Sequence, residues 1–296
     1  GPYAGLDLMR KIFDQTEANC DQEHLSVIQY SLSEHIIDRT RFLLGETDEN
    51  PGEAIGEIMV RMAKAGATVI GVPCNTAHSP RIMDVAVAML HEASPQTRFV
   101  HMIDAVALIR ESLPHARTIG VLSTKTYATG LYQDALSAAG FVPLFPDEEG
   151  RERVQQAISN TAYGIKALSN PVTPEARGHC LPGGKLVSRG RRVILGCTEI
   201  PLALTEPDLR GVPLLDATKV LARALIIAFA PERLKKSLGY FFQNIALSFY
   251  ILGTAYVCFF AFHCVFPSGR TLGGRRRLGY VGLPLAVAFA RHFSVI

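Results

Sequence analysis

Two short segments place a cysteine directly after an apolar run and before small hydroxyl or amide side chains. They are residues 72–78 (VPCNTAH), which contain Cys74, and residues 195–199 (LGCTE), which contain Cys197. A thiol beside such donors can be tuned toward its thiolate form. A turn of this kind also exposes backbone N–H groups that can hold a carboxylate. The side chains expected to add donors to such a carboxylate site are Asn75, Thr76 and Thr198.

Two thiols on opposite sides of one carbon atom can invert its configuration. One sulfur, as thiolate, removes the α-proton, and the other, as thiol, delivers a proton to the opposite face. If each sulfur lies roughly 3–3.5 Å from the reacting carbon, the two sulfurs should be about 6–7 Å apart. We therefore expect Cys74 and Cys197 to remain free thiols and to exchange the roles of acid and base with the handedness of the substrate.

The bulk composition excludes several other classes of protein. Of the 296 residues, 48% are hydrophobic and 19% are charged, which indicates a globular chain with a sizeable core. The net charge of +3 is too small to indicate a nucleic-acid partner. No signal peptide opens the sequence, so we expect a cytoplasmic protein with reduced thiols. Neither a metal site nor a disulfide framework is expected from the remaining, scattered cysteines, Cys20, Cys180, Cys258 and Cys264.

The elements that must position the two cysteines alternate between strand and helix. Strands are predicted at residues 25–30, 68–72, 99–103, 118–122, 193–195 and 212–215, and helices at residues 6–14, 54–65, 85–91, 132–139, 154–168 and 219–230. Such alternation is typical of an α/β fold with parallel sheets. The strand–helix alternation occurs in two successive series, and in each series one strand is followed directly by a candidate cysteine. We therefore expect two pseudo-symmetric lobes, with the active site in the cleft between them, at the carboxyl ends of the strands.

Further segments point to a known family. They are residues 21–24 (DQEH), 37–40 (IDRT), 122–126 (LSTKT) with 130–132 (GLY), and 212–216 (VPLLD). Together with the two cysteine segments, they resemble the aspartate/glutamate racemase superfamily over residues 1–230. Glu199 after the second Cys-Thr, and Ala-His after the first Asn-Thr, make the chain more similar to the aspartate racemase branch.

This resemblance implies a cofactor-free enzyme, without pyridoxal phosphate or metal, that is often a homodimer. It also implies an arginine and a lysine that read the second carboxylate of the substrate, matched here by Arg39 and Lys166. Arginine suits such a role because its guanidinium can bind a carboxylate through two hydrogen bonds. Thr124 and Glu199 are further candidates for substrate contacts. For Thr124 a turn-capping role is the alternative, and for His78 and Glu199 the alternatives are orienting a thiol and a plain structural hydrogen bond.

The resemblance divides the chain into three parts. Residues 1–104 with 212–232 form the first racemase lobe, and residues 105–211 form the second. The family opens with a strand that this sequence lacks before Gly1, and residues 180–192 depart from the family pattern. Residues 233–296 form an apolar and basic tail with no place in the family.

The tail carries two patterns of its own. Residues 245–262 hold no charge, so a membrane contact is expected only through this segment, although polar side chains weaken it as a span. Residues 278–287 resemble the opening of nucleotide-sugar dehydrogenases, but Arg277 stands where the first glycine of the dinucleotide turn is expected, which argues against NAD binding.

The function expected from these patterns is racemisation of a small amino acid, aspartate or glutamate, by two-thiol proton transfer. A maleate isomerase-like activity and a broad-specificity racemase are alternatives within the superfamily. A degenerate, non-catalytic family member is an alternative from a different class. The intact cysteine segments favour an enzyme, whereas the lacking first strand and the altered residues 180–192 favour the degenerate member.

Overall fold

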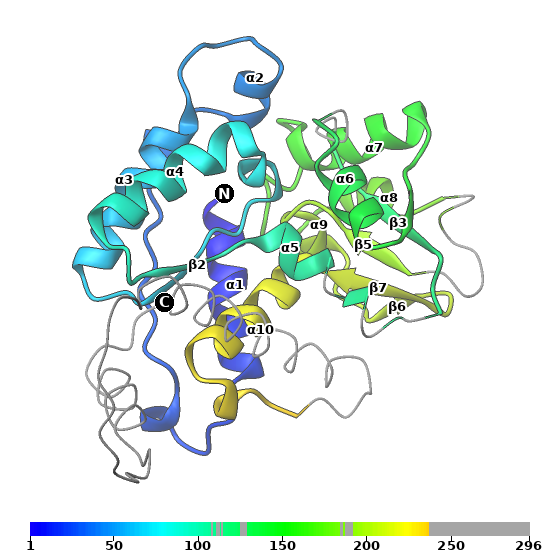
Figure 1. Ribbon diagram of the computed structural model, residues 1–296. Helices are drawn as coiled ribbons and strands as arrows, with labels where there is room; N and C mark the ends of the chain where they lie inside the picture. Colours follow the sequence, from blue (N-terminus) through cyan, green and yellow to red (C-terminus); the bar gives the residue numbers. More distant parts are fainter. Residues whose placement is uncertain are drawn as a thin grey trace, which may run out of the picture.

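The computed structural model of the chain describes residues 1–107, 109–110, 113, 115–124, 129–183, 186 and 192–236. Over these residues helices and strands alternate, and the strands form two sheets. Figure 1 shows the smaller sheet on one side of the molecule and the larger sheet on the other, each accompanied by helices. This arrangement confirms the predicted α/β fold with parallel sheets flanked by helices.

The described elements have the following bounds. The helices are α1 (Pro2–Gln15), α2 (Arg39–Leu43), α3 (Pro51–Lys64), α4 (Pro80–Ala93), α5 (Met102–Ala107), α6 (Leu131–Ala138), α7 (Glu148–Ser159), α8 (Pro174–Cys180), α9 (Ile200–Ala203) and α10 (Ala217–Phe229). The strands are β1 (Val69–Gly71), β2 (Arg98–Val100), β3 (Thr118–Leu122), β4 (Val142–Leu144), β5 (Val193–Leu195), β6 (Asp208–Leu209) and β7 (Val212–Asp216).

The smaller sheet pairs β1 and β2 in parallel, with Ile70 opposite Phe99. Helices α3 and α4 pack against each other beside this sheet (Figure 1). Helix α3 begins where Asn50 accepts a hydrogen bond from Gly52 N at 2.8 Å and Pro51 occupies the first turn. Its apolar side chains recur at helical spacing and join a buried cluster with α4 and β1, which includes Ile55, Met59, Ile70, Ile82, Met83 and Leu90.

The larger sheet has the order β4-β3-β5-β7-β6, parallel except for the β6–β7 pair. Strand β5 is central, and all three of its side chains are buried. A parallel strand covered on both faces needs a continuous apolar run, which explains the sequence of this segment. The carboxyl ends of β3 and β5 are in register, with Leu122 opposite Leu195. Thr124 and Cys197 therefore follow neighbouring strands by the same number of residues.

Residues 212–232, which the sequence assigned to the first lobe, contribute to both halves. Strand β7 pairs with β5 of the larger sheet, whereas α10 packs on α1 and also contacts β1. Lys11 of α1 makes ion pairs with Asp7 and with Asp216 at the end of β7. The largest apolar cluster accordingly joins both halves and includes Leu8, Val69, Ile103, Val121, Leu136 and Leu225.

The prediction of a strand at residues 25–30 is wrong, since the segment forms no ladder with any described strand. A cavity of about 180 Å³ is lined by residues 27–33 on one side and by residues 70–74 on the other. The segment and the end of β1 thus line one cavity without sharing a ladder. A strand is defined by its hydrogen-bonded neighbour, so apolar composition alone could not produce one here.

The prediction of a helix over residues 154–168 is correct only for its first part, because α7 ends at Ser159. The Asn160 side chain accepts hydrogen bonds from Ala162 N at 2.8 Å and Tyr163 N at 3.3 Å. Such side-chain bonds offer the backbone a turn in place of the next helical turn. The next helix, α8, begins where Thr173 accepts a hydrogen bond from Ala176 N at 3.1 Å.

Most of the predicted tail lies outside the described residues, which end at residue 236. The uncharged segment 245–262 and the dehydrogenase-like segment 278–287 both fall there, as do most of residues 184–191. Within the part of the chain that the structure describes, no helix combines the length and the apolar character needed to cross a bilayer.

Candidate functional site

Both candidate cysteines lie just after the carboxyl end of a parallel strand. Cys74 follows β1 in an extended conformation and precedes a 3-10 turn over Asn75–His78. Cys197 follows β5, and Gly196 N donates to Leu122 O of β3 at 2.7 Å. Each cysteine is half-buried. The local structure that the sequence predicted at each cysteine is therefore present.

His78 holds the peptide of Cys74 rather than its thiol. The ring Nδ1–H donates to Cys74 O at 2.9 Å, and the ring stacks on Phe99 with centroids 5.8 Å apart. Burial, followed by the nearby His101, lowers the pKa of His78 to about 3. The ring is therefore neutral at working pH, which suits a hydrogen-bond donor in the core. Of the alternatives open for His78, the structure supports the structural hydrogen bond.

Arg39 lies beside Cys74. Asp38 caps α2 by accepting from Thr40 N at 2.8 Å and Arg41 N at 3.1 Å, which sets Arg39 at the start of this helix. The interaction of the guanidinium with the Cys74 sulfur is the main reason that the pKa of Arg39 is raised, although burial opposes the shift. The charge of Glu199 also contributes. Arg39 therefore interacts electrostatically with Cys74 of the first cysteine segment and with Glu199 of the second.

Glu199 lies against Cys197. The Cys197 Sγ–H donates to Glu199 Oε2 at 3.0 Å, and the Thr198 hydroxyl donates to the same oxygen at 3.3 Å. Burial, together with the negative charge of Glu199 and the hydrogen bond to it, raises the pKa of the Cys197 thiol well above its usual value. The geometry therefore favours the thiol-orienting role for Glu199 and keeps Cys197 protonated.

Lys166 adds positive charge to the same region from an exposed position after α7. Burial alone would raise the pKa of Glu199, but the Gly1 ammonium, the Cys197 thiol and Lys166 together lower it. Lys166 also lowers the pKa of Asp38, against the opposing effect of burial. The resemblance matched two cations, Arg39 and Lys166. Both interact electrostatically with the Glu199 carboxylate, which accepts the hydrogen bond of Cys197.

The remaining predicted residues contribute in different ways. Asn75 is buried, and its Oδ1 accepts a hydrogen bond from the hydroxyl of Tyr132 at 2.6 Å. Thr76 supports the turn through its carbonyl, which accepts from Ser79 N at 3.2 Å. Thr124 is buried close after β3. The separation of the two sulfurs, expected to be about 6–7 Å, stays a prediction.

Sequence reasoning missed Tyr132, although its GLY segment was among the family-like segments. Tyr132 lies in the first turn of α6, in the half that holds Cys197, and it bonds Asn75 in the half that holds Cys74. The charge of Cys197 contributes to the raised pKa of Tyr132, after burial. A tyrosine hydroxyl near both cysteine segments could have been found only from the fold.

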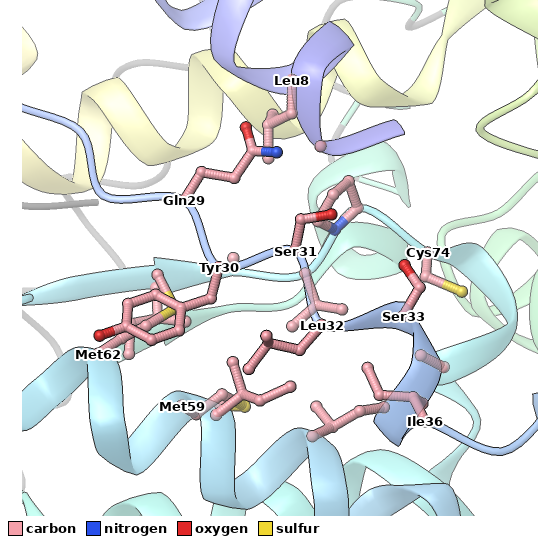
Figure 2. A pocket seen from close by; sticks show the side chains of 18 of the residues that line it. Leu8, Gln29, Tyr30, Ser31, Leu32, Ser33, Ile36, Met59, Met62 and Cys74 are labelled. Atoms are coloured by element: carbon pink, nitrogen blue, oxygen red, sulfur yellow. The ribbon is translucent and has the colours of Figure 1, made fainter. Parts of the chain in front are cut away.

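A largely apolar cavity reaches Cys74 and is lined by Arg39 as well. It has a volume of about 180 Å³ and is bounded by α1, residues 27–33, α3 and β1. Figure 2 shows Cys74 at one end of this cavity, with Met59, Met62 and Leu32 along it. Cys197 does not line it. Among the described residues no cluster of His, Cys, Asp and Glu side chains has the geometry of a metal site.

Comparison with known proteins agrees with this arrangement. The model of the family described as Asp/Glu/Hydantoin racemase matches residues 1–225. The chain is 26% identical to Picrophilus torridus aspartate racemase, with a TM-score of 0.59 over 80% of this chain and 93% of that one. It is 24% identical to an aspartate racemase homologue from Pyrococcus horikoshii OT3, whose TM-score of 0.53, over 76% of this chain and 93% of that one, shows a shared fold.

A further relative is the broad specificity amino-acid racemase of Bacillus subtilis, 25% identical over 60% of this chain and 71% of that protein. The family match spans both strand-end cysteines and the segments that carry Arg39, Tyr132 and Lys166. The chain therefore belongs to the Asp/Glu/hydantoin racemase family.

Proposed function

We propose that the chain racemises an amino acid, aspartate or glutamate, by proton transfer between Cys74 and Cys197, without pyridoxal phosphate. The observation that carries this proposal is the convergence of the two strand-end cysteine segments. Arg39 bonds Cys74 and responds to the charge of Glu199, while Glu199 accepts the hydrogen bond of Cys197. Membership in a family that includes aspartate racemases supports the proposed reaction.

The two thiols have different surroundings, and these assign their resting roles. Arg39 places a positive charge beside the Cys74 sulfur, whereas Glu199 holds Cys197 as the protonated thiol. In the proposed forward step the Cys74 thiolate takes the α-proton, and Cys197 gives its proton to the opposite face of the carbon. The products are the inverted amino acid, a Cys74 thiol and a Cys197 thiolate. In the reverse direction Cys197 is therefore the base and Cys74 is the acid.

The negative charge that develops on the substrate carboxylate must be stabilised during this step. The backbone N–H groups of the turn after Cys74, with the Asn75 amide, provide neutral donors next to the reacting sulfur. Arg39 and Lys166 provide the positive charge that a second carboxylate requires. This division of donors explains why an acidic amino acid is the preferred substrate class in the proposal.

Deuterium incorporation at Cα of aspartate in D₂O tests the mechanism. We expect exchange by the unchanged chain and its loss in both Cys74→Ser and Cys197→Ser. Cys20→Ser is the matched control, because Cys20 is an exposed free thiol away from the site. Prior dialysis against hydroxylamine, which removes pyridoxal phosphate, should leave the rate unchanged. Exchange that persists in both serine variants would refute the two-thiol mechanism.

A broad-specificity racemase is the second candidate. The apolar cavity that ends at Cys74 could receive an aliphatic side chain (Figure 2), and the Bacillus subtilis relative carries this activity in its name. The same exchange assay with leucine and methionine separates the candidates. Faster exchange with these substrates than with aspartate would favour broad specificity. The expected homodimer stays a prediction, to be measured by light scattering.

A further inference from the structure

Tyr132 and Asn75 form a polar contact between the two halves of the chain. The Tyr132 hydroxyl donates to Asn75 Oδ1 at 2.6 Å, across 57 positions of sequence. Both side chains are only 6% exposed. Asn75 directly follows Cys74, and the Tyr132 ring lies against Gly196, which directly precedes Cys197. The hydrogen bond therefore joins a neighbour of Cys74 in the chain to a side chain that contacts the neighbour of Cys197.

The position of the tyrosine ring is fixed by its surroundings. Gly130, with a φ of 73°, begins α6 and turns Tyr132 toward β5. The ring lies against Gly196, where an added Cβ would be 3.1 Å from Tyr132 Cε2. Burial raises the pKa of Tyr132, as do the charges of Cys197 and Asp216. The hydroxyl consequently stays protonated and acts as a hydrogen-bond donor at any working pH.

The donor role of Tyr132 fixes the Asn75 amide in one orientation. Because Oδ1 accepts from the hydroxyl, the amide nitrogen is directed elsewhere. Among the described residues, Asn75 Nδ2 has no hydrogen-bond partner, although it is buried. An unpaired buried donor costs about 1–3 kcal/mol. An oxygen that arrives with a ligand, such as one from a carboxylate, would remove this cost.

We propose that Tyr132 is a positioning residue of the site, which orients the Asn75 amide so that its N–H groups receive the α-carboxylate of the substrate. This inference rests on the proposed racemase function and extends it. It also makes substrate binding depend on the arrangement of the two halves, since the amide follows β1 of one half and the hydroxyl that orients it belongs to α6 of the other.

The test is a double-mutant cycle with Tyr132→Phe, Asn75→Ala and the double variant. Tyr132→Phe keeps the ring and removes only the hydroxyl. We expect kcat/KM for aspartate exchange to fall about tenfold, mainly through KM, as for the loss of one hydrogen bond to a charged group. The double variant should be no worse than Asn75→Ala alone, because the two residues act as one unit. Tyr163→Phe is the matched control, since its hydroxyl bonds His179 instead.

Succinate binding, measured by titration calorimetry, separates this inference from the proposed reaction. Succinate has two carboxylates and no stereocentre, so its affinity reports positioning even in a chain that shows no turnover. We expect Tyr132→Phe to weaken succinate binding about tenfold, measured well below the melting temperature, which should itself fall because Asn75 Oδ1 loses its buried donor. Additive effects in the cycle, equal succinate affinity in both proteins, or no succinate binding by the unchanged chain would overturn the inference.

Discussion

Gly196 gives a quantitative test of how the second cysteine turn is built. A Cβ added at this position would lie 2.8 Å from Leu122 O, 3.1 Å from Tyr132 Cε2 and 3.1 Å from Val121 Cγ1. The first contact is with backbone that pairs with Gly196 N, so it cannot be relieved by a side-chain rotation. Gly196→Ala should therefore overpack the junction of β3, β5 and α6. Such overpacking destabilises a fold by about 1–3 kcal/mol.

The expected result is a fall in melting temperature of about 4–8 °C, taking about 2 kcal/mol and a domain of this size. Gly178→Ala is the control, because a Cβ there meets no atom within 4 Å. Gly178 is exposed within α8, where alanine should stabilise by about 0.5–1 kcal/mol. Calorimetric and urea unfolding of both variants measure the two effects. A loss of the same size in both, or no loss in Gly196→Ala, would refute the packing described for this junction.

Two further predictions concern charge at the site. Glu199→Gln removes the negative charge that helps keep Cys197 protonated, so iodoacetamide should alkylate Cys197 several-fold faster at pH 8. The alkylation rate of Cys74 should stay the same, and peptide mass spectrometry measures both rates. An unchanged rate at Cys197 would contradict the role of Glu199. Burial lowers the pKa of His78 to about 3, so the unfolded chain takes up a proton below pH about 6.5 that the folded chain does not. Stability should therefore fall as pH drops from this value toward the folded pKa, by about 2 kcal/mol between pH 7 and pH 5 in urea unfolding. His78→Gln should flatten this slope and His35→Gln, at an exposed position, should not; equal slopes in all three proteins would show that His78 does not titrate in this way.

Much of the fold was predictable because it depends on local patterns. The apolar run of β5 and the helical spacing of α3 are set by neighbours within a few residues, and both elements form as predicted. The strand expected at residues 25–30 does not form because a strand needs a hydrogen-bonded partner, and this segment pairs with no described strand.

In the candidate site, too, the local features were predictable from the sequence and the contacts between distant residues were not. Motif spacing predicted that Cys74 and Cys197 follow strands, but it did not predict what each thiol contacts. Arg39, matched as a reader of the second carboxylate, also interacts with the Cys74 sulfur. Glu199 accepts a hydrogen bond directly from the Cys197 thiol. These pairings depend on how loops of two different sheets approach one another, for which a single sequence carries no signal.

The sequence by itself determined the chemistry available to this protein: two thiols, each at the end of a buried strand and beside hydroxyl or amide donors. Local propensity and turn chemistry suffice for that, because every residue involved lies within a few positions of its cysteine. Only the tertiary structure decided that Tyr132 meets Asn75 and that Arg39 lies near both cysteine segments. Such contacts join residues far apart in the chain, and they form only when the shared apolar core brings the two halves together.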